Sequence, residues 1–402
     1  MRIIHTADWH LGQTFYDHSR KKEHLHFLSW LQNTAQERGA DVLLIAGDVF
    51  DSPNPSAESQ KIFYRFLKEL NATCPHIQVI VIAGNHDSAA RLEAPNPLLE
   101  TMNVSICGIV KKDESGQIIS DNLIVPIQKS EETVGYVLAV PYLRQGDYPD
   151  AKTYTAGVGN LYRLLFDQVK DEQKPVIAMG HLQATGSEIS INDHAERTII
   201  GGLEAISPDI FAPEIRYTAL GHLHRAQQVS KRENVRYAGA PLPMSFAEKH
   251  NKQGVWFIEV ENDETHIEKI FYDTPVKLWS IPSLPSKSKF TLSEILEEIS
   301  QLPEGKKNSN SPFLEVKVHI AQPEPSLRHQ IEETVANKAV RLARIEAVAP
   351  QKDSNSETIT FEELRTISPM EIALDSYKRK FGGEEMPVEM QELLQGIIEE
   401  KL

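Results

Sequence analysis

The stretch Asp41-Val42-Leu43-Leu44-Ile45-Ala46-Gly47-Asp48-Val49-Phe50-Asp51 contains a short apolar run that stops at a Gly-Asp pair. A run of this length, with charge on one side and glycine on the other, predicts a buried strand rather than a helix. The carboxylate of Asp48 then lies just past the carboxyl end of that strand, and Gly47 lets the backbone bend close to a ligand. We therefore place Asp48 at the centre of a candidate ligand site.

Four further apolar runs end in aspartate, asparagine or histidine in the same way. They lie within the segments Arg2–His10, Val79–Asp87, Val176–His181 and Tyr217–His224. In an open α/β sheet, ligand sites form outside the carboxyl ends of the strands. The sequence therefore predicts that the polar residues after the five runs meet at one place.

The composition is that of a soluble globular protein. The chain has 402 residues, of which 40% are hydrophobic and 25% charged, and no apolar run reaches the length of a membrane span. We expect no signal peptide, because the N-terminus enters a strand at once. The two cysteines, Cys74 and Cys107, are far apart, as expected for a cytoplasmic protein. A net charge of −15 argues against coating of nucleic acid by bulk electrostatics, although it leaves local basic contacts open.

The pattern of apolar residues divides the chain into three parts. Residues 1–275 alternate strand-like and helical segments, as in an α/β domain that closes with a β-hairpin. A proline-rich and serine-rich linker near Ile281 precedes a small α+β unit, residues 276–350, and a polar stretch precedes a helical tail, residues 351–402. The expected helices are 20–38, 56–70, 91–102, 292–299 and 326–338, and the expected later strands are 254–260, 266–272 and 313–320.

The residues at the strand ends form a set of oxygen and imidazole ligands. Such a set suits Mn, Fe or Zn, and the absence of cysteine from it argues against a closed structural zinc site. The set is too large for one metal ion, so two ions that share a carboxylate fit it better. Two metal ions about 3.5–4 Å apart can generate hydroxide and stabilise an in-line displacement at phosphorus. The candidates are Asp8, His10, Asp48, Asp51, Asn85, His86, Asp87, His181, His222 and His224.

Each motif taken alone has an ordinary structural interpretation. Asp-x-His occurs by chance on surfaces, Gly-Asn-His is a turn sequence, and Gly-His can hold a hydrogen-bonded core histidine. Their joint occurrence, each after an apolar run, favours the metal interpretation. The remaining histidines lack this setting, and we interpret them as core or surface residues.

Three segments carry a resemblance to a known family: Arg2–Gln13, Ala46–Asp51 and Tyr237–Pro241. With the other strand-end motifs, they resemble the calcineurin-like metallophosphoesterase superfamily and, within it, the SbcD family of Mre-type DNA-repair nucleases. The resemblance is specific over residues 1 to about 260. It implies a two-sheet sandwich flanked by helices, a small α+β capping domain, and a helical C-terminal tail that docks on a partner.

The resemblance also implies roles for individual residues. Asp48 would bridge two metal ions, and His86 would lie over the scissile phosphate and stabilise or protonate the leaving oxygen. Asp87 could fix the orientation or tautomer of His86. Asp51 stands where archaeal relatives often carry a histidine, so that histidine's role is not transferred, and Asp51 would instead contact ligands. One ion would be held by Asp8, His10, Asp48 and His224, and the other by Asp48, Asn85, His181 and His222.

The resemblance further implies a manganese-dependent nuclease that degrades duplex ends and opens DNA hairpins, as a double-strand exonuclease and hairpin endonuclease, in DNA repair, recombination and replication. No Gly-x-x-x-x-Gly-Lys-Ser/Thr loop occurs in the sequence, so ATP dependence would come from an SbcC-type ATPase subunit. The helices at 56–70 and 91–102 would pair two nuclease subunits, which gives a homodimer within a heterotetramer. No membrane partner is expected.

Two other functions stay open. A phosphoesterase with the same core could act on nucleotides or phosphoproteins, although the extra domain and tail favour the nuclease. A metal-free scaffold is disfavoured, because every expected ligand position holds a competent ligand. In the tail, an apolar stripe begins near Pro387 and could pack on the nuclease domain or dock on the partner; we favour the partner. The stripe consists of Met390, Leu393, Leu394, Ile397 and Ile398.

Overall fold

The computed structural model describes most of the chain in two compact units, Met1–Val348 and Ala349–Leu402. In the first unit it describes residues 1–187, 205–283, 290–320 and 324–348. In the second unit it describes Met370, Ala373, Leu374, Tyr377, Met386, Pro387, Met390, Gln391 and Gln395.

The first large sheet contains three of the predicted strands side by side. Strand β1 pairs in parallel with β4, β4 with β5, and β5 with β6, so the carboxyl ends of all four strands lie at one edge. Strand β13 pairs antiparallel with β1 and forms the predicted hairpin with β14. The order across the sheet is β14 (Glu264–Phe271), β13 (Gly254–Glu261), β1 (Arg2–Thr6), β4 (Val42–Ala46), β5 (Gln78–Ile82) and β6 (Val104–Cys107).

The second large sheet contains the other two predicted strands at its centre. Strands β8, β9, β10 and β12 are parallel to one another, and β7 and β11 pair antiparallel at the two edges. The order is β11 (Gln227–Val229), β12 (Arg232–Tyr237), β10 (Tyr217–Gly221), β9 (Val176–His181), β8 (Glu132–Ala139) and β7 (Ile124–Lys129).

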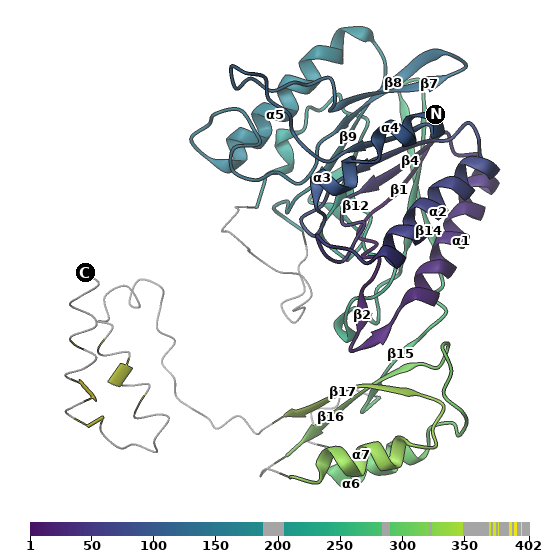
Figure 1. The fold of residues 1–402 in the computed structure, drawn as a ribbon, viewed down its shortest axis with the longest axis vertical. Helices are drawn as coiled ribbons and strands as arrows, with labels where there is room; N and C mark the ends of the chain where they lie inside the picture. The colour runs from purple at the N-terminus through teal and green to yellow at the C-terminus, as the bar shows by residue number, and fades with distance from the viewer. Residues whose placement is uncertain are drawn as a thin grey trace. The chain divides into compact units, whose positions relative to one another are not determined.

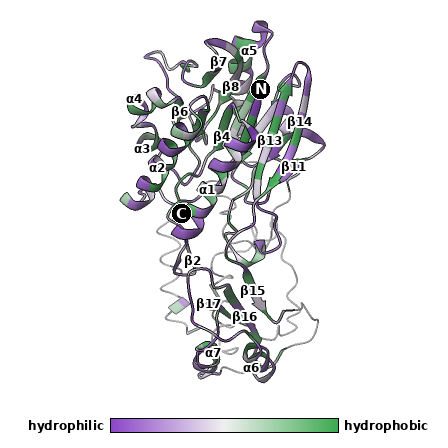
Figure 2. Ribbon diagram, turned by 90° about the vertical axis from the view of Figure 1, so that its right-hand side faces the viewer, coloured by the Kyte–Doolittle hydropathy of each residue, from purple (hydrophilic) through white to green (hydrophobic). Residues whose placement is uncertain are grey.

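The two sheets pack face to face, and helices cover their outer faces (Figure 1). Alternate strand residues such as Leu44, Ile80 and Ile177 form the core between the sheets. The outer face of the first sheet is covered by α1 (Lys21–Arg38) and α2 (Ala57–Thr73), and that of the second by α5 (Tyr154–Val169). Figure 2 shows α1 and α2 with both hydrophilic and hydrophobic residues, as expected for helices with one buried face. The predicted helix-flanked two-sheet sandwich is therefore confirmed.

A smaller three-stranded sheet follows, with its own core. Strand β16 (Phe313–His319) lies between β15 (Leu278–Ile281) and β17 (Arg341–Val348), all parallel, and α6 (Leu292–Ser300) and α7 (Leu327–Val335) cover the sheet. The composition around Ile281 indicates a linker, but residues up to Ile281 form a strand. The reason is tertiary: β15 gains its backbone partners from β16, which lies more than thirty positions later in the sequence.

A few aromatic contacts connect this small sheet to the sandwich. Phe15 lies in a buried cluster with Phe246 and Phe313, and the ring centroids of Phe15 and Phe313 are 4.8 Å apart. The remaining elements are short: β2 (Thr14–Phe15), β3 (His18–Ser19), α3 (Ala89–Glu93), α4 (Asn96–Leu99), η1 (Glu100–Met102), η2 (Lys170–Glu172), η3 (Pro208–Ile210) and η4 (Phe246–Glu248). The single helix expected over 91–102 is thus broken into three short pieces, α3, α4 and η1.

Within the described ranges, none of the helices combines the length and apolar character needed to cross a membrane. Most of the predicted tail helix lies outside the described residues. Of it, the structure shows that the backbone N–H groups of Met390 and Gln391 donate to the carbonyl of Pro387, at 3.0 and 3.1 Å.

Candidate metal centre

The loops after β1 and β4 are hydrogen-bonded to each other directly past the strand ends. The backbone N–H of Asp8 donates to the carbonyl of Gly47, and that of His10 donates to the carbonyl of Asp48, both at 3.0 Å. The parallel register of the two strands therefore continues into the loops. As a result, the side chains of these two motifs are held side by side.

Four of the predicted ligands have unusual backbone conformations. The φ angles are 55° for Asp8, 46° for His10, 49° for Asp48 and 102° for His222. Residues with a Cβ rarely adopt positive φ, and such strain collects at functional sites, where the surrounding structure enforces it. The glycines of the motifs allow the close packing: a Cβ on Gly84 would lie 2.7 Å from the Asp48 carboxyl carbon.

Asp8, Asp48 and His181 form a buried group in which the three ligand atoms lie within 4.8 Å of one another. His181 Nε2 lies 3.3 Å from Asp48 Oδ2, and His181 Nδ1 donates to the carbonyl of Ala46 at 2.9 Å. The backbone N–H of His222 donates to Asp8 Oδ1 at 2.9 Å. Strand ends from both sheets therefore contribute to the same buried group.

Asn85 lies between two of the histidines. Its Oδ1 is 2.9 Å from His181 Nε2 and 3.0 Å from His222 Nδ1. The ring of His224 is 5.2 Å from that of His10, centroid to centroid. The structure thus brings all seven predicted metal ligands together: Asp8, His10, Asp48, Asn85, His181, His222 and His224.

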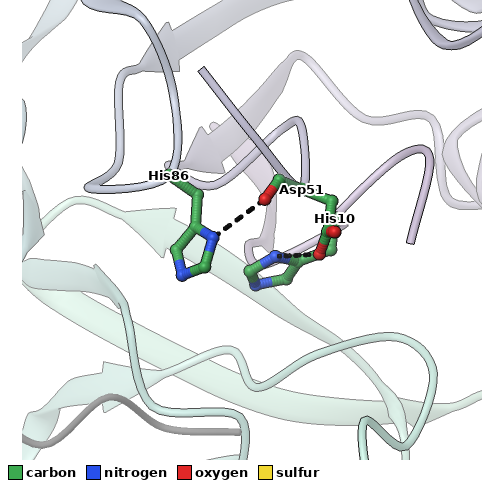
Figure 3. A group of neighbouring side chains, drawn as sticks. All are labelled: His10, Asp51 and His86. Atoms are coloured by element: carbon green, nitrogen blue, oxygen red, sulfur yellow. Dashed lines mark hydrogen bonds and ion pairs between the residues drawn. The ribbon is translucent and has the colours of Figure 1, made fainter. Parts of the chain in front are cut away.

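His86 and Asp51 are half-buried, unlike the buried His10, and Figure 3 shows Asp51 in contact with both histidines. Asp51 contacts two histidines with different atoms: its carboxylate lies 3.4 Å from His10 Nδ1, and its backbone carbonyl lies 3.0 Å from His86 Nδ1. A carboxylate only accepts a hydrogen bond, so the contact favours the tautomer of His10 with the proton on Nδ1 and a lone pair on Nε2.

The contacts of Asp87 differ from the expectation that it orients His86. Its carboxylate accepts hydrogen bonds from the backbone N–H groups of Val49, Phe50 and Gly84, at 3.2, 2.9 and 2.9 Å. The group that fixes the His86 ring is the Asp51 carbonyl. The prediction erred because Asp87 is adjacent to His86 in sequence, whereas its side chain is directed back to the β4 loop. Asp87 therefore joins the β4 and β5 loops.

Burial changes the protonation of the cluster. It raises the pKa of Asp8 to about 7, and it lowers the pKa of His222 to about 3. Burial also opposes the charged forms of Asp48 and His181, but the attraction between the two dominates. It holds the pKa of Asp48 below its usual range and raises the pKa of His181 to about 9. Without a metal ion, an imidazolium therefore compensates the buried carboxylates.

The cluster fits divalent metal ions on its own geometry. Among the described residues, two buried ligand atoms, Asp8 Oδ2 and His10 Nε2, have no hydrogen-bond partner. Buried polar atoms are nearly always satisfied, and each such exception calls for an explanation. A cation bound between these atoms supplies one, and an oxygen and imidazole donor set suits Mn²⁺, Fe²⁺ or Zn²⁺.

We expect metal binding to release protons, because ligands bind metal in their deprotonated forms. At pH 7, His181 with a pKa of about 9 must lose its proton, and Asp8 with a pKa of about 7 is half protonated. Affinity for Mn²⁺ should therefore rise as the pH increases from 6 to about 9. Calorimetric titration of the metal-free protein in buffers of different ionisation enthalpy should show release of more than one proton per chain. A buffer-independent enthalpy would contradict this expectation.

A two-sheet α/β sandwich with a buried Asp/His cluster at the carboxyl ends of its strands defines a metal-dependent phosphoesterase. The calcineurin-like phosphoesterase family model matches residues 1–226, and the type 5 capsule protein repressor C-terminal domain model matches residues 265–381. The chain therefore belongs to the calcineurin-like phosphoesterases and, by its similarity to curated relatives, to the SbcD family of nucleases.

Three of these relatives are named as the SbcD component of the nuclease SbcCD. That of Rhodobacter capsulatus is 34% identical over 364 residues, which cover 87% of this chain and 88% of that protein. That of Escherichia coli K12 is 36% identical over 277 residues, 65% of this chain and 66% of that protein. That of Bacillus subtilis 168 is 31% identical over 275 residues, 66% of this chain and 67% of that protein.

Proposed function

We propose that this chain is the nuclease subunit of an SbcCD-type complex, a metal-dependent phosphodiesterase that hydrolyses DNA and works with an SbcC-type ATPase. The similarity to SbcD nucleases over most of the chain supports the assignment. The observation that carries the chemistry is the buried cluster, in which Asp8, Asp48 and His181 lie within 4.8 Å. The finer activities that we propose are double-strand exonuclease and hairpin endonuclease cleavage, in DNA repair, recombination and replication.

We assign two divalent ions to the cluster, with manganese as the metal. One ion would be held by Asp8, His10, Asp48 and His224, and the other by Asp48, Asn85, His181 and His222. When bound, such a pair activates water for attack on phosphorus and stabilises charge on the phosphate oxygens. Asp48 suits the shared position, because its Oδ2 lies 3.3 Å from His181 Nε2 and 3.7 Å from His10 Nε2, ligands assigned to different ions.

The chain's own residues would position the DNA and handle the proton. His86 is half-buried, and its Nδ1 is held by the Asp51 carbonyl, which leaves Nε2 for the leaving oxygen. Asp51 would also hold the ring of His10 through its carboxylate. Asp87 would support the site indirectly, by joining the loops that carry Asp48 and Asn85.

Cleavage assays test the proposed function. Purified protein with Mn²⁺ should cut hairpin and blunt duplex DNA, and the ATPase subunit with ATP should stimulate cleavage. A generic phosphodiester such as bis-p-nitrophenyl phosphate should be a poor substrate in comparison. Hydrolysis of nucleotides or phosphoproteins without any cleavage of DNA would instead support a small-substrate phosphoesterase.

For assembly, we propose a homodimer of this chain within a heterotetramer with the ATPase, paired through α2 and the α3–η1 region. We assign residues 1–275 to the nuclease domain, 276–350 to a capping domain and 351–402 to partner binding. The β15–β17 sheet has a core of its own, which supports the assignment of residues 276–350 to a separate domain. The two buried cysteines, both with free thiols, support a cytoplasmic location.

The partner-binding assignment predicts the effect of truncation after Pro350. The shortened chain should stay folded, load metal, melt at the same temperature and keep its partner-independent nuclease activity, because the unit Met1–Val348 contains the sandwich and the cluster. It should no longer co-purify with the ATPase, and ATP should no longer stimulate cleavage. The full-length chain in parallel is the control. Complex formation at full affinity, or unfolding, would show that the tail belongs to the core.

A further inference from the structure

Glu248, at the end of the short helix η4, is a buried acid next to a predicted metal ligand. The residue is 3% exposed, and its two carboxylate oxygens have different partners. Oε2 accepts a hydrogen bond from the backbone N–H of Met244 at 2.9 Å, and Oε1 lies 3.3 Å from His224 Nδ1. None of the strand-end motifs includes this residue, which follows a Pro- and Ser-containing loop instead of an apolar run.

This arrangement determines which nitrogen of His224 can bind a metal. A carboxylate oxygen accepts a hydrogen bond, so the proton of a neutral His224 must be on Nδ1. Nε2 then keeps its lone pair. The His224 and His10 rings are 5.2 Å apart and nearly perpendicular, at 85°. Carboxylates that hold metal-binding histidines in this way fix both the tautomer and the ring orientation.

We propose that Glu248 is a positioning residue that fixes the tautomer and orientation of His224 for metal binding. The inference rests on the proposed ligand role of His224 and assigns Glu248 no contact with metal or substrate. It resembles the contact of Asp51 with His10, but the environment differs. The Asp51 side chain is 42% exposed, whereas that of Glu248 is 4% exposed, so water screens the Glu248 contact much less.

The segment that carries Glu248 is itself held in place from two sides. Phe246 is buried in the aromatic cluster with Phe15 and Phe313, and its ring centroid is 5.3 Å from that of Phe15. Lys249 Nζ donates to Ser280 Oγ at 3.0 Å, on strand β15. The residues on both sides of Glu248 are therefore packed or hydrogen-bonded to other elements, which holds its carboxylate next to His224.

The test is Glu248→Gln in the full-length chain, with Mn²⁺ binding measured by calorimetry on metal-free protein. The glutamine amide has one acceptor and one donor end, so it cannot accept from both Met244 N–H and His224 Nδ1–H. Loss of such a supporting contact typically lowers metal affinity by about 10–100-fold. We expect that loss at one of the two sites, with the other site unchanged. DNA binding and the melting temperature in EDTA should match those of the unmodified chain.

Two reference variants make the outcome specific. Glu93→Gln changes another glutamate with little exposure, on α3, whose side chain is 13% exposed and pairs with Lys111 at 3.3 Å, and should leave Mn²⁺ affinity unchanged. His224→Ala should weaken one site by itself, and adding Glu248→Gln to it should weaken that site no further, because Glu248 acts through His224.

The outcomes separate this inference from the proposed function. If His224→Ala leaves both Mn²⁺ affinities unchanged, the ligand assignment fails. If His224→Ala weakens one site but Glu248→Gln does not, only the role of Glu248 is overturned. A further loss of affinity when Glu248→Gln is added to His224→Ala would also overturn that role. So would unfolding of the Glu248→Gln variant in EDTA, which would show that Glu248 stabilises the 244–249 segment instead.

Discussion

Asp48→Asn is expected to leave a folded chain that binds neither metal ion tightly and has no measurable nuclease activity. The substitution removes the one negative charge that both proposed ions share. In the structure, Asp48 Oδ1 accepts the backbone N–H of His86 at 2.8 Å, and Oδ2 lies 3.3 Å from His181 Nε2. An asparagine can still accept the hydrogen bond from the His86 N–H through its amide oxygen. The loops after β4 and β5 should therefore keep their conformation. The asparagine NH₂ group would then occupy the position of the metal-facing oxygen.

The expected loss exceeds that of a supporting residue. Changes to groups that only hold a ligand cost about 10–100-fold in metal affinity, so loss of the shared ligand should cost more than about 100-fold at both sites. Elemental analysis of purified protein measures the ion content, and Asp51→Asn is a matched control that alters a carboxylate 3.4 Å from His10 Nδ1. Asp51→Asn should retain more metal than Asp48→Asn. Two tightly bound ions per chain in Asp48→Asn would refute the bridging assignment.

His86→Ala should separate chemistry from metal binding. The contact between His86 and Asp48 is made by the backbone N–H, at 2.8 Å, and therefore survives the substitution. What is lost is the imidazole, which the Asp51 carbonyl holds at 3.0 Å. General acid catalysis of this kind typically contributes about 10²–10⁴-fold in rate. We expect a loss of that size in DNA cleavage, with metal content and DNA binding retained.

The measurement is single-turnover cleavage of hairpin DNA, together with metal analysis and a binding assay on the same preparations. His76→Ala, an exposed histidine in the loop before β5, is the control and should behave like the unmodified chain. Cleavage at the full rate, or loss of the metal ions, would contradict the assignment of His86.

The sequence was most informative where the functional residues come directly after buried strands. Val42–Ala46 and Gln78–Ile82 are fully buried runs in a parallel sheet, and such strands have a continuous apolar pattern that ends sharply. The polar residue after each end could therefore be placed at one edge of the sheet. This is why all the predicted metal ligands meet in the structure, although they come from segments spread over more than two hundred residues.

The sequence was least informative where a partner comes from elsewhere in the chain. Glu248 contacts His224 across a loop without a regular period, and Asp87 is adjacent to His86 but contacts the β4 loop. Strand β15 is short and includes Trp279 and Ser280, so its pattern resembles a linker until β16 supplies the backbone hydrogen bonds. In each case a distant contact outweighs the local signal.

The division of the ligands between the sheets has a consequence for folding. Asp8, Asp48 and Asn85 follow strands of the first sheet, whereas His181 and His222 belong to strand ends of the second. Ions bound by ligands from both groups would link the two sheets at the carboxyl ends of their strands. A ligand that binds only the folded state stabilises it by about 2.7 kcal/mol at a concentration 100 times its Kd. Metal-free protein should therefore be less stable than metal-loaded protein, and the edge of the sandwich that carries the ligands should open first.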